Sequence, residues 1–304
     1  MANLKEVRIR IESVKSTQQI TKAMKMVAAS KLRKAQVAIL KLRPYAFKLK
    51  EVINNIIEDK KYLEAIEKSG SCLTKVREEK KILLVVIASN KGLCGAFNSN
   101  IIKATNNLIK DKYSKQADKT QGDLSLICIG KKVSDFYTKN EYNVVGTYDQ
   151  LFDSLTFENI IPVAEKIMKS FANKEYDKVE IIYNEFKNAA KQVLTTEQFL
   201  PVIFDHTEIL EKKGNKIPTD FIFEPNKERI INELIPRTLK IQFYKALLDS
   251  NASEQGARMT AMHIATDNAI EILKDLKLSY NKARQATITK EMLEIVSGAE
   301  ALKG

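Results

Sequence analysis

The segment 89–98 (SNKGLCGAFN) carries the residue types closest to a phosphate-binding loop. It follows an apolar run and precedes a helical pattern, so Gly92, Gly95 and the first helix amides could cradle a phosphate. The chain has no GxxxxGK[ST] loop, and its only Gly-Lys pair, Gly130-Lys131, lacks the upstream glycine and the following hydroxyl. We therefore interpret Gly92 and Gly95 as a tight strand-to-helix turn, with a nucleotide site as the alternative.

The histidines and cysteines suggest little metal or nucleophile chemistry. His206 and His263 are the only histidines, and neither has a neighbour at ligand spacing. Cys94 precedes a helix N-terminus, which favours a thiolate, but no histidine lies near it in sequence, so a buried thiol is the simpler interpretation. Cys72, Cys94 and Cys128 form no CxxC pair, and their odd number favours a reducing compartment over a disulfide framework.

Positive charge is concentrated near the N-terminus. Residues 1–43 contain eleven Lys/Arg and two acidic residues, and therefore hold nine of the twelve excess positive charges of the chain. Such a run is typical of a solvated helix face, of a surface that meets an acidic protein, or of a nucleic-acid site. No aromatic residue occurs in this segment to stack on bases, so we favour an acidic protein partner.

These side chains are positioned by a long N-terminal helix. Apolar or small residues recur in steps of three and four over residues 4–42, which predicts a helix with a coiled-coil seam. Within residues 18–25 the seam positions are polar, and we expect this segment to face something other than the partner helix. Pro44 is expected to kink or break the helix, with a second helical piece reaching residue 57. A second apolar stripe on a neighbouring face consists of Ile20, Met24 and Val27.

The C-terminal residues 228–297 repeat the pattern, and Pro236 is expected to kink their first turns. Seventy helical residues at ~1.5 Å each give a rod of roughly 105 Å, which needs a partner helix. We therefore predict a long antiparallel coiled coil of residues 1–57 and 228–304. Small residues over 252–265 would make its middle thin enough to fit a narrow hole.

The central segment alternates short apolar runs with helical patterns, which predicts a Rossmann-like α/β domain over residues 75–206 with a mainly parallel sheet. Residues 207–227 are expected to be a linker. The expected strands are 82–88, 124–129, 142–145 and 179–183, with a possible edge strand at 192–204; the expected helices are 98–112, 131–140 and 157–174.

Composition bounds the class of protein. With 304 residues and 44% hydrophobic content, the chain can bury a substantial core. Its first residues are charged and amphipathic rather than signal-like, and no stretch reaches the ~18 uncharged residues of a membrane span. We expect a soluble protein that can lie beside a membrane.

Both ends of the chain resemble the gamma subunits of F-type ATP synthases. The N-terminal match is residues 11–33 (IESVKSTQQITKAMKMVAASKLR), and the central match is KGLCGAFN at 91–98. The C-terminal matches are ARMTAM at 257–262, ATDNA at 265–269, YNKARQATITKE at 280–291 and IVSGA at 295–299. The resemblance spans the whole chain and is closest at the two ends.

The resemblance implies a central rotor stalk without catalytic residues, cofactor, metal or small-molecule substrate. Its partners would be three alpha and three beta subunits, an epsilon subunit and the ring of membrane c subunits, and no nucleic acid. It would be a peripheral protein on the cytoplasmic face of the bacterial inner membrane, with a role in ATP synthesis and hydrogen ion transport. The expected contacts with alpha and beta subunits are Arg8, Arg10, Lys22, Met24, Lys25, Arg284 and Gln285.

Two other functions stay open at this point. One is an enzyme with a Rossmann-like nucleotide-binding domain and helical arms for dimerisation. The other is a basic coiled-coil scaffold for nucleic acid, which predicts salt-dependent affinity for DNA.

Overall fold

The computed structural model describes residues 4–57, 72–114, 116, 123–189, 191–202 and 227–302. Contacts between residues divide the chain into two compact units. The first, here called the terminal unit, combines Met1–Ala29 with Arg258–Gly304, and the second, the globular unit, is Ser30–Ala257. Within the described residues, none of the helices is long and apolar enough to span a membrane.

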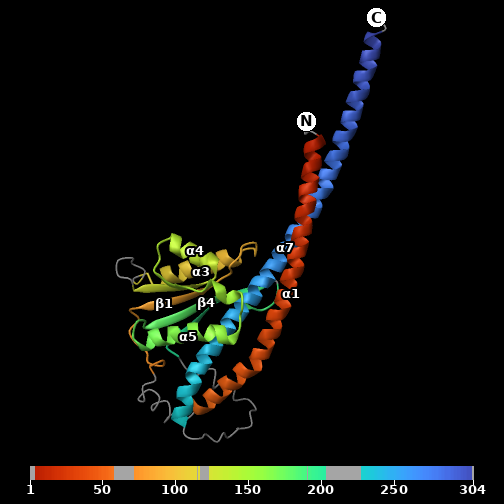
Figure 1. Ribbon diagram of the computed structural model, residues 1–304. Coiled ribbons are helices and arrows are strands. Elements are labelled where there is room, and N and C mark those ends of the chain that lie inside the picture. The colour runs from red at the N-terminus through yellow and green to blue at the C-terminus, as the bar shows by residue number, and fades with distance from the viewer. Residues whose placement is uncertain are drawn as a thin grey trace. The chain divides into compact units, whose positions relative to one another are not determined.

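Two long helices dominate the chain ends. Helix α1 is Leu4–Ile57 and helix α7 is Lys227–Ala301. In the terminal unit they lie side by side and run in opposite directions, as the predicted antiparallel coiled coil requires (Figure 1).

The helix break expected at Pro44 is wrong, because α1 continues through it. Helix α7 likewise continues through Pro236. A proline removes one backbone donor. In the globular unit, apolar packing near the proline offsets the missing backbone hydrogen bond. Leu49 is buried there with Ile241 of α7, and Leu42 packs against them.

The α1 seam continues through the polar stretch 18–25. Thr21 is only 9% exposed, and its Oγ1 lies 2.9 Å from Oγ1 of Thr266 on α7. Gln18 and Lys25 are half-buried. The expectation that this segment faces away from the partner helix is therefore wrong, because the two hydroxyl groups are complementary to each other and the same helix face stays against α7.

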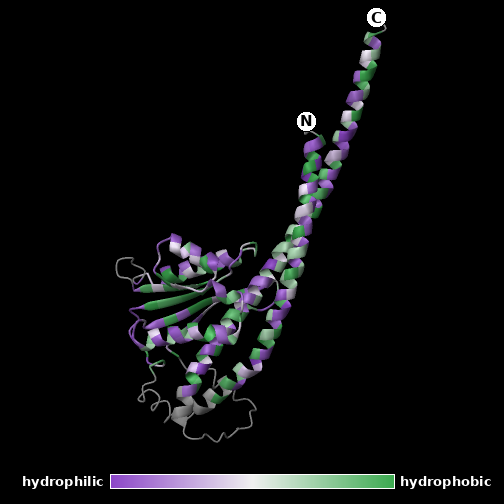
Figure 2. Cartoon of the chain, in the orientation of Figure 1, coloured by the Kyte–Doolittle hydropathy of each residue, from purple (hydrophilic) through white to green (hydrophobic). Residues whose placement is uncertain are grey.

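The predicted second stripe is where α1 faces outward. Ile20 and Val27 are each 57% exposed, and Met24 is half-buried. Figure 2 shows hydrophobic and hydrophilic residues mixed along the terminal helices, whereas the strands of the globular unit are mainly hydrophobic.

The globular unit contains one five-stranded sheet in the order β3-β2-β1-β4-β5. Strands β1 to β4 are parallel to one another where they pair, and β5 is antiparallel to β4. This confirms the predicted Rossmann-like unit with a mainly parallel sheet. The strands are β1 Ile82–Ile87, β2 Leu124–Ile129, β3 Val144–Thr147, β4 Lys178–Phe186 and β5 Gln192–Leu200.

Helices cover both faces of this sheet (Figure 1). One face packs on α3 (Phe97–Lys112) and α4 (Lys131–Lys139). The other packs on α5 (Phe157–Ala172) and on residues 235–247 of α7. A short 3-10 helix, η1 (Asp149–Phe152), follows β3. Because β1 is buried on both faces, its six residues are all apolar, as expected for a central parallel strand.

The expected boundaries differ from the observed ones where local packing intervenes. The predicted third strand, 142–145, is observed at Val144–Thr147, because Tyr142 instead closes the turn after α4 with its ring against Tyr137. Strand β4 runs beyond residue 183 because a hairpin with β5 continues its ladder to Phe186. The expected edge strand 192–204 ends at Leu200, and residues 203–226, with most of the expected linker, lie outside the described residues.

Asp249 of α7 is 3% exposed inside the globular unit. Burial raises the pKa of its carboxyl group to about 6. The nearby Lys245 and Arg43 cations lower this pKa, while Glu185 of β4 and Glu197 of β5 raise it. The ionised carboxylate therefore destabilises the contact between α7 and the sheet at neutral pH.

We predict that Asp249→Asn stabilises the globular unit above pH 6. An aspartate in the unfolded chain has a pKa of about 4, and the higher pKa in the folded chain costs the native state up to about 3 kcal/mol at high pH. This cost falls as the pH drops through 6 and is gone below 4. Near-UV circular dichroism reports mainly on this unit, because the buried tyrosines Tyr113, Tyr137 and Tyr183 lie in it.

The thermal midpoint of the variant should exceed that of the parent at pH 8, and the two should converge near pH 4. Asp153→Asn, at an exposed aspartate of the same unit, should change neither value. An Asp249→Asn gain that is constant with pH would contradict the assigned pKa.

Candidate functional site

The predicted contact residues of α1 flank its seam. Arg8 and Lys22 are separated by two heptads and share one flank, while Arg10 and Met24 share the other. Arg8, Arg10 and Lys22 are exposed, and Met24 is half-buried. Lys25 occupies a seam position and is half-buried beside it. The cationic groups are therefore presented next to the line of contact with α7.

Few acidic groups offset this charge. Arg8 Nε lies 3.9 Å from Glu12 Oε1, and both side chains are largely exposed. An exposed pair at this distance contributes little binding energy and is screened by salt. The surface of α1 in the terminal unit is thus a positive strip.

An apolar patch adjoins the charges. Ile20, Met26 and Val27 are all exposed on α1 within two helical turns. Ile20 and Val27 are one heptad apart on the same outward side of α1, and exposed apolar side chains grouped on one side favour burial by a partner.

Arg284 and Gln285 lie just beyond the end of the seam, whose last half-buried residue is Ala283. Every residue from Arg284 to Leu302 is exposed. At ~1.5 Å per residue, this tip of α7 is roughly 28 Å long. Its large exposed apolar side chains are Ile288, Met292, Leu293, Ile295, Val296 and Leu302.

The predicted contact residues fall into two zones along the terminal unit. With Thr21 level with Thr266 and the helices antiparallel, the start of α1 lies level with about residue 283. Arg8 and Arg10 are therefore within a few turns of Arg284 and Gln285. Lys22, Met24 and Lys25 form a second zone, roughly 30 Å from Arg284 along the axis.

The loop after β1 uses its own polar groups to close a turn. Ser89 N–H donates to Asn98 Oδ1 at 3.1 Å, and Lys131 N–H donates to Asn90 Oδ1 at 3.1 Å. Gly95 has a φ of 61°, in the left-handed region. The Ser89 and Lys131 amides at this turn are thus bonded to asparagine side chains of the protein, and Phe97 N–H at the start of α3 lies 3.4 Å from the Cys94 carbonyl oxygen, which favours the turn interpretation over a nucleotide site.

Gly130, from the Gly-Lys pair, has a structural role. Its φ is 108°, and a Cβ there would lie 2.4 Å from the Ala88 carbonyl oxygen. Only glycine fits this close approach of β2 to the end of β1.

Cys94 is buried, and its Sγ lies 3.3 Å from Nδ2 of Asn98, which donates to it. This environment fits a packed thiol. His263 Nδ1 lies 3.1 Å from Asp267 Oδ2 one turn along α7, with both side chains exposed, and His206 lies outside the described residues. Among the residues that the structure describes, no three His, Cys, Asp or Glu side chains are grouped to hold a metal ion.

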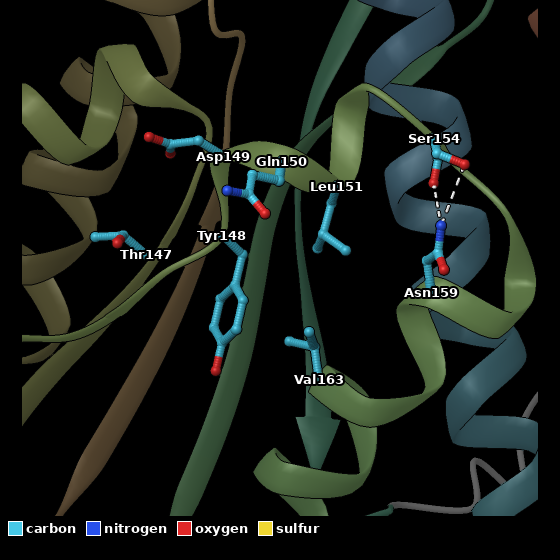
Figure 3. Close-up of a pocket in the computed structure, with 8 residues that line it drawn as sticks. All are labelled: Thr147, Tyr148, Asp149, Gln150, Leu151, Ser154, Asn159 and Val163. Carbon is cyan, nitrogen blue, oxygen red and sulfur yellow. Dashed lines mark hydrogen bonds between the residues drawn. The ribbon is translucent and has the colours of Figure 1, made fainter.

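A pocket of about 620 Å³ lies beside the end of β3 (Figure 3). Asn159 Nδ2 donates to the Ser154 carbonyl oxygen at 3.0 Å, and Asn90 Nδ2 donates to the Asp149 carbonyl oxygen at 2.8 Å. The lining has one carboxylate, that of Asp149, together with hydroxyl and amide groups. The pocket therefore offers hydrogen bonds but no pair of acid and base groups. The lining residues are Thr147, Tyr148, Asp149, Gln150, Leu151, Ser154, Asn159 and Val163.

The prediction of a break in the seam at Thr21 is wrong, and Thr266 is not among the residues predicted for the site. The signal was present in the spacing. Thr266 lies four residues after Met262 and three before Ala269, which are both buried seam residues. Polar residues at matching seam positions of two helices indicate a polar layer rather than a break.

Comparisons with known proteins agree over the full length. The family model described as ATP synthase matches residues 3–302. The chain is 54% identical to the ATP synthase gamma chain of Flavobacterium johnsoniae, with 100% of both chains covered. It is 52% identical to that of Cytophaga hutchinsonii, with 99% of both chains covered.

Solved structures with a similar fold include the central stalk and c-ring of the Tetrahymena thermophila mitochondrial ATP synthase. That match has 28% identity and a TM-score of 0.58, and covers 81% of this chain and 99% of the other. A chain of the Euglena gracilis mitochondrial ATP synthase is similar at 22% identity with a TM-score of 0.64, covering 98% and 94%. The basic paired helices, the Rossmann-like unit and the full-length matches lead to one conclusion: this chain belongs to the ATP synthase gamma-chain family.

Proposed function

We propose that the chain is the non-catalytic central rotor stalk of an F-type ATP synthase, transmitting rotation of a membrane c ring to catalytic beta subunits. The observation that carries this is the exposed apolar tip of α7 beyond the coiled-coil seam. Ile288, Met292, Ile295 and Val296 recur at i, i+4, i+7 and i+8, so they share one broad face, and such an exposed apolar face is stable when a surrounding surface buries it. A ring of three alpha and three beta subunits would supply that surface.

The coupling would work through unequal contacts. A ligand or rotor shifts a conformational equilibrium only by the difference in its interaction with the two states. The terminal unit has such unequal sides, because one side of α1 faces α7 and the outward one carries the Ile20–Val27 patch. As the stalk turns, each beta subunit would meet a different side in sequence.

The remaining partners would bind elsewhere. The globular unit would contact an epsilon subunit and the c ring, and the whole would lie at the cytoplasmic face of the inner membrane. ATP would be made in beta, because this chain has no GxxxxGK[ST] loop and the turn after β1 is closed by hydrogen bonds to its own asparagine side chains.

Purification of the complex tests this function. Mild extraction of membranes should retrieve this chain with alpha and beta subunits in threefold excess, measured by quantitative mass spectrometry. Absence of alpha and beta would contradict the proposal. Calorimetric binding of ATP or NAD to the isolated chain would instead favour the enzyme alternative, and a DNA complex at physiological salt would favour the scaffold.

We also predict that Arg284→Ala weakens coupling. A hydrogen bond to a charged group contributes about 1.5–3 kcal/mol. Its loss at the zone of Arg284 and Gln285 should lower the number of protons pumped per ATP hydrolysed by at least about twofold. ATP-driven acidification of membrane vesicles, together with ATPase rate, measures this ratio.

Lys290→Ala is the matched control. Lys290 is also exposed on the α7 tip, but its Nζ is paired with Glu294 on the same helix at 3.6 Å. It should leave the ratio unchanged. Equal ratios in Arg284→Ala and the parent complex would remove Arg284 from the contact zone.

A further inference from the structure

Two threonine hydroxyls meet inside the seam of the terminal unit. Thr21 Oγ1 and Thr266 Oγ1 are 2.9 Å apart. Each hydroxyl also lies close to a carbonyl oxygen of its own helix: Thr21 Oγ1 is 3.0 Å from that of Gln18, and Thr266 Oγ1 is 2.7 Å from that of Met262.

Each hydroxyl has one proton to donate, so these three contacts cannot all be hydrogen bonds at once. In two arrangements the hydroxyls bond to each other between the helices: Thr266 donates to Thr21 and Thr21 to the Gln18 carbonyl, or Thr21 donates to Thr266 and Thr266 to the Met262 carbonyl. In a third, each hydroxyl donates to the carbonyl of its own helix and no bond joins the helices. The two oxygens lie 2.9 Å apart, at hydrogen-bonding distance, which favours the arrangements that keep the bond between the helices.

The seam layers next to the threonine pair would tolerate an axial slip of one helix more easily than the pair itself. Ala28 of α1 and Ala269 of α7 are buried seam residues near the pair. If one helix slipped by a heptad, apolar or small residues would again oppose one another along much of the seam. Thr21 would then face Met259 or Leu273, and its bond to Thr266 would be lost. The hydroxyl pair distinguishes the observed register from its neighbours.

We propose that Thr21 and Thr266 are positioning residues that fix the register and mutual rotation of α1 and α7, and thereby place the Lys22–Lys25 contact zone. This deepens the proposed rotor function and rests on it. Lys22, Met24 and Lys25 lie within about one turn of Thr21, so a helix that rotates or slips there moves these side chains away from their partner.

A positioning role differs from a stabilising one in its energetics. Valine has nearly the shape of threonine, and replacing both members of a buried polar pair by apolar groups is often neutral or stabilising. The double variant Thr21→Val/Thr266→Val should therefore keep or raise the thermal midpoint of the chain while losing a single register. A merely stabilising pair would show a lower midpoint.

The first measurement uses the isolated full-length chain. Spin labels on cysteines introduced at the exposed positions Ser16 and Asn268, with Cys72 replaced by serine, report the distance between the helices by pulsed electron resonance. The parent should give one narrow distance distribution. The double valine variant should broaden it or add a second population, because a slip of one heptad moves one label by about 10 Å along the helix axis relative to the other.

The second measurement uses the assembled complex. The double valine variant should lower protons pumped per ATP hydrolysed by at least about twofold, and Thr21→Ser/Thr266→Ser, which keeps both hydroxyls, should restore both readouts. Thr17→Val is the matched control, because Thr17 is exposed on α1 and donates to the Ser13 carbonyl oxygen of its own helix at 3.0 Å. It should resemble the parent.

One narrow distance in the double valine variant would overturn the register role, and an altered distance with unchanged pumping would overturn the positioning role. Failure of the rotor function itself is separable. It would appear as absence of alpha and beta subunits from the parent complex, while the distance measurement on the isolated chain would still decide whether the hydroxyl pair sets the register.

Discussion

The pairing of the two chain ends is the constraint on which the rest of the structure depends. Neither α1 nor α7 can bury its seam alone, and an isolated helix gains too little from its own hydrogen bonds to remain stable at such length. Packing Val7, Ala28, Met262 and Ala269 into one seam removes their side chains from water. Pairing the first and last segments of the chain also leaves everything between them as a single insertion.

Helix α7 links the two units through one continuous backbone. Its residues Ile235, Leu239 and Phe243 belong to the core that covers one face of the sheet, and its residues from Arg258 onward belong to the terminal unit. In the globular unit, Ser253 Oγ also donates to the Asn184 carbonyl of β4 at 2.9 Å, which ties the same helix to the sheet near its middle.

In the terminal unit, the inward and outward faces of the helices carry different types of residue. Small and apolar residues, with one hydroxyl pair, face inward, while cations and the patch of Ile20, Met26 and Val27 face outward. Unequal sides are what a rotating shaft needs in order to favour different states of its neighbours. The same asymmetry makes the register of the two helices important, because a slip would move one set of contacts relative to the other.

The sequence alone determined the features that follow from periodicity. The steps of three and four predicted the coiled coil, and the apolar runs predicted a buried parallel sheet, since a central strand covered on both faces needs apolar residues throughout. The positions of Arg284 and Gln285 at the end of the seam could also be expected from spacing.

Only the tertiary structure decided the matters that depend on a partner surface. Pro44 was tolerated because α1 packs on α7 around it, and Tyr142 left its expected strand because Tyr137 offers a ring to contact. Thr21 continues the seam because Thr266 lies opposite it. The local sequence indicates that each such residue destabilises its helix or strand. The contact that compensates for Thr21 lies more than two hundred residues away in the chain, so only the folded structure shows it.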